Sequence, residues 1–245
     1  MDNTIGRRIR FFRERAGMSQ FDLEVEIGNS QGSLSRIESG QTNPSKETLG
    51  KISETLRLTQ LERMYLLGFL DEPATKIQIN AAVESISDYF DKENTYAYLL
   101  DDRYNLIKIS KGFISLLNLP KLLLKFAIGR NMVEVVFNPR SPVHKMIKWG
   151  ETENLGKHQV SRLAVEFGYL QSEPWMQELM ERLEKYPYFK KAWEEVQKSG
   201  PLDYYSKEAR TVKLDSGGKT ITFVYHVEQL KDHPRFMIIE FTPVG

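Results

Sequence analysis

At 245 residues the chain has room for two domains of ordinary size, and its apolar fraction of 40% suits globular folding. The absence of cysteine excludes disulfides, thiolate metal sites and thiol nucleophiles. A net charge of only +1 means that nucleic-acid binding would have to rest on a local patch. The charged N-terminus has no apolar core of a signal peptide, and no apolar run is long enough to cross a bilayer. We therefore expect a cytoplasmic protein without a membrane partner.

Residues 1–72 predict an all-α domain of five short helices. Ile5, Ile9 and Phe12 recur at helical spacing, and Gly17 ends this first helix. Ser19, followed three residues later by Asp22, predicts the start of a second helix that ends at Gly28-Asn29.

The next three helices are marked by their ends. Ser30 is the predicted cap of a third helix that runs to Ser39. Ser45 predicts the start of a fourth helix and Thr59 that of a fifth. The fifth helix is expected to run through Leu61, Met64, Leu67 and Phe69, and residues 71–73 end the domain.

The rest of the chain predicts a linker and then an α+β domain. Residues 73–95 form the linker, with a connecting helix at 79–90 whose apolar face must pack on its own domain or on a second protomer. Strands are predicted at 96–100, 106–110, 209–214, 220–227 and 236–242, with helices between 112 and 197 and a hairpin turn at 215–218. Two strands, a helical block and a final antiparallel set are the order of a PAS-like domain, here residues 96–245.

One constellation in the first domain resembles the Xre family of helix-turn-helix proteins. It comprises Ser19-Gln20 at a helix start, Gly28 at a turn, the stretch Ser35-Arg36-Ile37-Glu38 with Gly40, and Asn43-Pro44-Ser45. Such a pair of short helices lets the second one enter a DNA major groove. The resemblance therefore implies a transcription regulator that binds a double-stranded DNA operator, which we expect it to do as a homodimer.

The DNA-contacting residues follow from the resemblance and from exposure. Gln31 and Arg36 match the family's base-contacting positions, with Ser33 and Ser35 on the same outward side. Gln20 matches its phosphate contact, and Ser30, Thr42 and Asn43 are further phosphate candidates. Gly32 departs from the pattern, because many relatives carry a long polar reader there. Asp22, Glu24 and Glu26 also make the preceding helix acidic, which predicts weak non-specific binding.

The C-terminal part resembles the ligand-binding domain of MmyB-like regulators. The matching pieces include residues 56–67, Gly129-Arg130-Asn131, Trp149, residues 186–193 and Thr242-Pro243. The resemblance implies an apolar cavity for a fatty-acid-like molecule, with Arg130 placed to neutralise a head group. The candidate ligand-binding residues are Tyr98, Phe113, Leu117, Arg130, Phe137, Trp149, Phe223, Tyr225 and Ile239. An ordinary aromatic core is the alternative reading of the same residues.

Nothing in the sequence predicts an enzyme. The four histidines, His144, His158, His226 and His233, lack metal-ligand spacing, and the motifs of serine hydrolases and phosphate-binding loops are absent. We expect no cofactor other than a bound fatty acid or a similar apolar molecule. The alternative function is a partner-binding, antitoxin-like helix-turn-helix protein whose C-terminal domain is structural and ligand-free.

Overall fold

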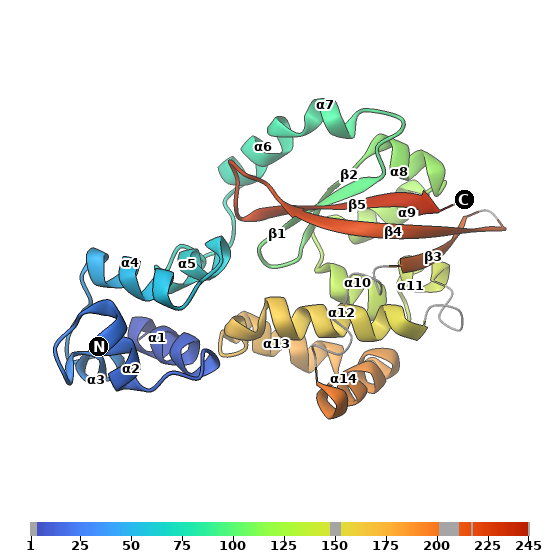
Figure 1. Ribbon diagram of the computed structural model, residues 1–245. Helices are drawn as coiled ribbons and strands as arrows, with labels where there is room; N and C mark the ends of the chain where they lie inside the picture. The colour runs from blue at the N-terminus through green and yellow to red at the C-terminus, as the bar shows by residue number, and fades with distance from the viewer. Residues whose placement is uncertain (1–3, 148–152, 201–210, 217, 245) are drawn as a thin grey trace. The chain divides into compact units, whose positions relative to one another are not determined.

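A computed structural model describes residues 4–147, 153–200, 211–216 and 218–244 (Figure 1). The chain forms two compact units, residues 1–72 and residues 73–245. Trp149 lies outside the described residues. Each unit has its own core, and the two are described separately.

The first unit is a bundle of five helices, as the sequence predicted. These are α1 (Thr4–Arg15), α2 (Gln20–Ile27), α3 (Ser33–Glu38), α4 (Lys46–Thr55) and α5 (Gln60–Leu66). Local capping sets three of the helix starts: the hydroxyls of Ser19, Ser45 and Thr59 each accept the backbone N–H three residues on. Fully buried side chains of α1, α2, α3 and α4 meet in the core: Ile9, Leu23, Leu34 and Ile52.

Two local predictions in this unit are wrong. The third helix begins at Ser33 and not after Ser30, because residues 31–32 form a turn with Gly32 in the left-handed region at φ 77°. The fifth helix ends at Leu66, and Gly68 turns the chain at φ 82°. Its inner face is therefore Tyr65 and Leu66, whereas Leu67 and Phe69 are 45% and 62% exposed.

The second unit contains a five-stranded antiparallel sheet. Its strands are β1 (Ala97–Asp101), β2 (Leu106–Ile109), β3 (Thr211–Ser216), β4 (Lys219–Gln229) and β5 (Phe236–Val244), in the order β2-β1-β5-β4-β3. The C-terminal strands β5 and β4 therefore lie between the first and third strands. This confirms the predicted fold class, a helical domain followed by an α+β domain with an antiparallel sheet.

One face of the sheet is covered by α6 (Lys76–Ser85) and α7 (Ser87–Phe90), as Figure 1 shows. Ala82, Ile86 and Phe90 pack with Ala97 and Leu99 of β1 in one buried cluster. The sequence predicted one connecting helix over 79–90, but it breaks at Ile86, where φ is −112°. Its apolar face packs on its own sheet, so residues 73–95 belong to the second unit rather than forming a separate linker.

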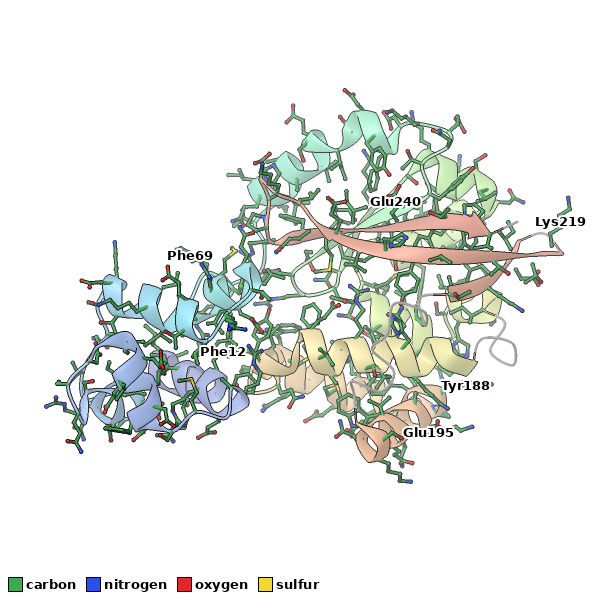
Figure 2. All side chains as sticks on the ribbon, in the orientation of Figure 1. Phe12, Phe69, Tyr188, Glu195, Lys219 and Glu240 are labelled. Carbon is green, nitrogen blue, oxygen red and sulfur yellow. The ribbon has the colours of Figure 1, made fainter. Side chains whose placement is uncertain are left out.

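The other face of the sheet carries the remaining helices. These are α8 (Lys111–Leu116), α9 (Lys121–Ala127), α10 (Met132–Phe137), α11 (Pro142–Met146), α12 (Glu153–Glu166), η1 (Gly168–Leu170), α13 (Pro174–Leu183) and α14 (Pro187–Ser199). Strand pairing places Tyr98, Ile239 and Tyr225 on this face, since Tyr98 lies opposite Ile239 and Tyr225 opposite Phe241. Phe113 of α8 stacks on Phe241 of β5 with ring centres 4.7 Å apart. Side chains fill the space between the sheet and α12 in Figure 2.

Candidate functional site

The helices α2 and α3 form a pair joined by a tight turn. Ser19 and Asp22 complete a capping box at the start of α2, and Gly28 ends the helix in the left-handed region at φ 70°. Leu34 and Ile37 anchor α3 inward with 0% and 5% of their surface exposed. The opposite side of α3 therefore faces solvent.

The carboxylate of Glu24 holds the start of α3. Its Oε1 accepts the Leu34 N–H at 2.7 Å, and its Oε2 accepts the Gly32 N–H at 3.1 Å. Glu24 comes from α2 and is only 3% exposed. From the sequence, Glu24 was counted only among the residues that make this helix acidic, and the capping role was given to Ser30. No local sequence signal indicated that Glu24 caps α3, because the contact with Leu34 spans ten residues and depends on the angle between two helices.

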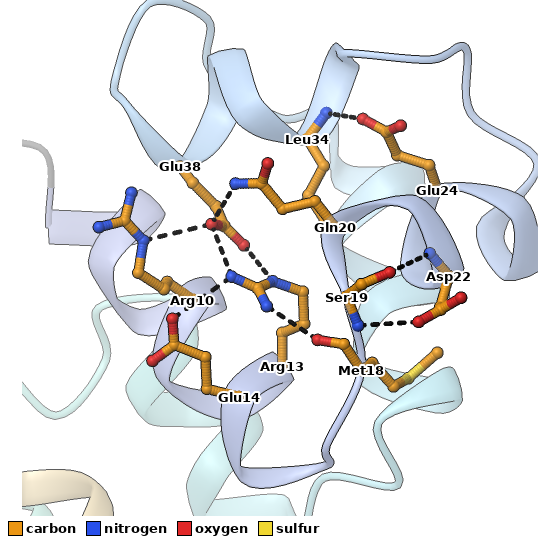
Figure 3. A network of polar contacts seen from close by, with 10 residues as sticks. All are labelled: Arg10, Arg13, Glu14, Met18, Ser19, Gln20, Asp22, Glu24, Leu34 and Glu38. Carbon is orange, nitrogen blue, oxygen red and sulfur yellow. Dashed lines mark hydrogen bonds and ion pairs between the residues drawn. The ribbon is translucent and has the colours of Figure 1, made fainter.

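The end of α3 is held by a second buried carboxylate, Glu38 (Figure 3). Glu38 accepts hydrogen bonds from Arg13 at 2.7 and 3.0 Å, from Gln20 at 2.8 Å and from Arg10 at 3.2 Å. Burial alone would raise the pKa of Glu38, but the hydrogen bonds from Arg13 and Gln20 and the charge of Arg13 outweigh it and lower the pKa. The start of α3 is thus fixed by the carboxylate of Glu24 from α2, and its end is fixed by the carboxylate of its own residue Glu38.

Most of the predicted DNA-contacting residues lie on the exposed side of this pair. The exposed ones are Ser30, Gln31, Ser35, Arg36, Thr42 and Asn43. Ser33 and Gln20 differ. The hydroxyl of Ser33 is buried in α3, and the amide nitrogen of Gln20 donates to Glu38. A DNA contact by either residue would therefore require another rotamer or a second hydrogen bond.

Comparison with known proteins assigns this pair of helices. Residues 9–62 match the helix-turn-helix family model. The first unit is a helix-turn-helix domain. Over 59 residues the chain is 49% identical to the HTH-type transcriptional regulator SlrR of Bacillus subtilis (strain 168), an alignment that covers 24% of this chain and 39% of that protein. The chain thus spans 39% of the length of this relative.

The second unit contains an apolar cavity of about 90 Å³ between the sheet and α8 to α12. Four of the predicted ligand-binding residues line it: Tyr98, Phe113, Leu117 and Tyr225. The polar side-chain groups among its described lining residues are the hydroxyls of Tyr98 and Tyr225 and the amide of Gln159, which donates to Tyr225 at 3.1 Å. Burial raises the pKa of Tyr98 to about 12, despite the positive charge of Arg162 nearby.

The structure does not bring the other predicted ligand residues to this cavity. Arg130 is exposed, with its guanidinium 4.9 Å from the Phe126 ring centre. Phe137 packs edge-on against Phe189, with ring centres 5.3 Å apart. Phe223 and Ile239 are buried in the sheet but do not line the cavity. The predicted residues that line the cavity thus include two from strands, Tyr98 and Tyr225, and two from α8 and its C-cap, Phe113 and Leu117.

Sequence reasoning missed a buried arginine near the cavity. Arg162 of α12 is 3% exposed and pairs with Glu166 at 2.9 Å. Its guanidinium lies 5.4 Å from the Tyr104 ring centre, and the Tyr104 hydroxyl donates to Glu166 at 3.3 Å. The i, i+4 spacing of Arg162 and Glu166 was the only signal in the sequence for this ion pair.

The part of the chain that the structure describes shows neither a metal site nor a membrane span. No cluster of His, Asp and Glu side chains there is arranged to hold a metal ion. No helix there has the length and apolar character needed to span a membrane.

Proposed function

We propose that this chain is a transcription regulator that reads a specific DNA sequence. The observation that carries the proposal is the arrangement of α3 and the turn before it: Leu34 and Ile37 are buried, whereas Gln31 and Arg36 are exposed to solvent. The helix-turn-helix match and the relative named as a transcriptional regulator support the same function.

In this proposal α3 enters the major groove, which is wide enough for a helix. Gln31 would pair with adenine, and Arg36 with guanine through its two parallel N–H groups. Gln20, Ser30, Thr42 and Asn43 would contact phosphates at the edges of the groove. With a net charge of +1, these contacts and not a general basic surface would supply the affinity.

We further propose that the protein binds as a homodimer to a two-fold-symmetric operator. Recognition helices of paired helix-turn-helix domains read half-sites about 34 Å apart along the duplex. Binding to a palindrome should therefore be much tighter than to a single half-site.

The test is to capture fragmented genomic DNA with the purified full chain and to sequence what it retains. A shared, two-fold-symmetric motif is the expected result, and competition by unlabelled motif DNA should remove the fragments. Absence of any enriched sequence would contradict the proposal and favour the partner-binding, antitoxin-like alternative.

For the second unit we propose a PAS-like sensor of a small apolar ligand. The support is the cavity, whose lining is almost wholly apolar and carries the hydroxyl of Tyr98 and the amide of Gln159. The resemblance to MmyB-like regulators implies a fatty-acid-like ligand. At about 90 Å³ the cavity is smaller than the roughly 150 Å³ that accommodates benzene. An acyl chain would therefore have to widen it on binding.

Extraction of the purified chain with organic solvent, followed by mass spectrometry, tests this proposal directly. The expected result is one apolar molecule in near-stoichiometric amount, absent from a control protein prepared from the same cells. If the extract is empty and a panel of fatty acids leaves the melting temperature unchanged, the ligand proposal fails while the DNA-binding proposal stands.

A further inference from the structure

Glu24 occupies an unusual place for a carboxylate. It lies on α2 between the buried residue Leu23 and the exposed residue Val25, and only 3% of its surface is exposed. Its two oxygens accept the backbone N–H groups of Leu34 and Gly32 at 2.7 and 3.1 Å. The bond to Leu34 is drawn in Figure 3. One side chain of α2 thus holds two backbone donors, those of Gly32 and Leu34, at the start of α3.

The helix α3 depends on this contact because of its own sequence. It has six residues, too few to be stable as an isolated helix. The N–H groups of a first helical turn have no partner within the helix, and Gly32 at the cap position has no side chain to supply one. The carboxylate of Glu24 replaces the missing cap, and hydrogen bonds to a charged acceptor are stronger than those to a neutral one.

The two proposed base readers lie at different distances from this contact. Gln31 immediately precedes Gly32, so the turn that Glu24 holds sets the direction of the Gln31 side chain. Arg36 lies in the second half of α3, where its carbonyl accepts the N–H groups of Gln41 and Thr42 at 2.8 and 3.2 Å. The neighbouring Glu38 fixes that half to Arg13.

We infer that Glu24 is a positioning residue that fixes the base preference read by Gln31, and that it has little influence on the base read by Arg36. The inference rests on the proposed function, since it assigns a role within that DNA interface. Glu24 acts through the backbone of Gly32 and Leu34 and does not itself contact DNA.

The experiment measures the base preference at every operator position by selection from a randomised DNA library with the full chain. The variants are Glu24→Gln, Gln31→Ala and, as a matched control, Glu26→Gln. Glu24→Gln keeps the length of the side chain but places an NH₂ group against one of the two backbone donors. Glu26 is an exposed glutamate on the same helix. It therefore controls for the loss of one negative charge from α2.

Glu24→Gln should relax the preference at the position that Gln31→Ala relaxes, by about fivefold or more, the lower end of what one bidentate side chain contributes. The preference at the Arg36 position and the binding to random DNA should stay within about twofold, and Glu26→Gln should match the wild type. A merely structural role would instead lower binding at all positions together.

A second variant tests the inference independently, in case Glu24→Gln disrupts the fold of the first unit. In Gly32→Ala the new Cβ meets no atom within 4 Å, so the substitution strains only the left-handed backbone of the turn. It should relax the same base position. An unchanged preference in both variants, or a uniform loss across positions, overturns the inference. A wild-type protein that selects no sequence overturns the proposed function itself, a result distinguishable from either.

Discussion

Arg13 in α1 and Glu38 in α3 form a buried ion pair, with Arg13 Nε 2.7 Å from Glu38 Oε1. The side chain of Glu38 is fully buried and that of Arg13 is 9% exposed. Because Glu38 also receives Gln20 of α2, this one carboxylate joins the first three helices of the helix-turn-helix domain. The ion pair therefore fixes the orientation of the exposed side of α3 within the domain.

Replacing Arg13 by Met should destabilise this domain strongly. It leaves the Glu38 carboxylate buried without its main partner, which typically costs about 3–5 kcal/mol. The measurement is urea unfolding of the full chain followed by circular dichroism and tryptophan fluorescence. All three tryptophans lie after residue 73, so a transition seen only by circular dichroism reports the first unit. Glu47→Gln, at an exposed pair with Lys51, is the control and should change little.

The two units should respond to acid in opposite directions. Arg13 and its neighbours lower the pKa of Glu38 against the effect of burial. The stability that ionised Glu38 contributes to the first unit is therefore present above the unfolded pKa of about 4.3, and it is lost as the pH falls through the folded pKa. In the second unit burial raises the pKa values of Asp101 and Asp102, even though Arg235 donates to Asp102 at 2.6 Å. Their stabilisation is present below an unfolded pKa of about 3.9 and is lost as the pH rises through the folded values.

Thermal unfolding between pH 7 and pH 3.5 measures this difference. As the pH falls, the transition seen by tryptophan fluorescence should hold or move to higher temperature. The transition seen only by circular dichroism should move to lower temperature below about pH 4.3. Parallel shifts of the two transitions would show that other groups dominate the pH dependence.

What the sequence predicted correctly was mostly local or periodic. Ser19, Ser45 and Thr59 cap helices through residues three positions away, so their role was visible in the sequence itself. Runs of apolar residues and the turn at 215–218 likewise predicted all five strands of the sheet. Both kinds of signal need no knowledge of how elements pack.

What it missed depends on packing between elements. The cap of α3 comes from Glu24 on another helix, and no spacing rule connects it with Gly32. Arg130 was expected at a ligand head group, but it lies on the surface. The buried arginine near the cavity is Arg162, since the rotation of α12 turns that residue toward Tyr104 and Met237. These contacts are fixed only after the helices have docked.

Replacing Ile86 by Glu should destabilise the second unit. Ile86 is 6% exposed and packs with Ala97 and Leu99 of its own sheet, so Ile86→Glu buries an unpaired charge and should cost about 3 kcal/mol or more. The unfolding transition seen by tryptophan fluorescence should move to lower urea concentration, while the transition of the first unit is unchanged. Ile77→Glu in α6 is the control, because Ile77 is 82% exposed and should tolerate the change. Equal effects of the two variants would contradict the packing described.

Arg36→Ala tests the proposed contact with a base. On the cognate operator it should cost about 1–3 kcal/mol of binding free energy and relax one base position, with little loss on random DNA. Gln20→Ala should weaken binding to all sequences to a similar extent, since phosphate contacts carry no sequence information. Lys51→Ala, an exposed cation on α4, controls for the loss of one positive charge. Equal loss by Arg36→Ala on operator and random DNA would reassign Arg36 to the phosphates.

The last prediction concerns the cavity and its coupling to DNA binding. Ala127 of α9 is fully buried and lines the cavity, so Ala127→Leu places a larger apolar side chain in that space. If the cavity is a ligand site, the variant should lose the extractable apolar molecule, keep or raise the melting temperature, and bind the operator with an affinity that no longer depends on added ligand.

The coupling requires that the ligand bind more tightly to one of two states, the DNA-competent or the DNA-incompetent one, because equal affinities shift no equilibrium. Operator affinity should therefore change when the wild type is saturated with the extracted molecule, and Ala127→Leu should abolish that change. Ile128, the next residue, is 48% exposed and absent from the cavity lining, so Ile128→Leu is the matched control and should respond like the wild type. A wild type whose operator affinity is the same with and without saturating ligand would leave the second unit as a scaffold, whatever its cavity holds.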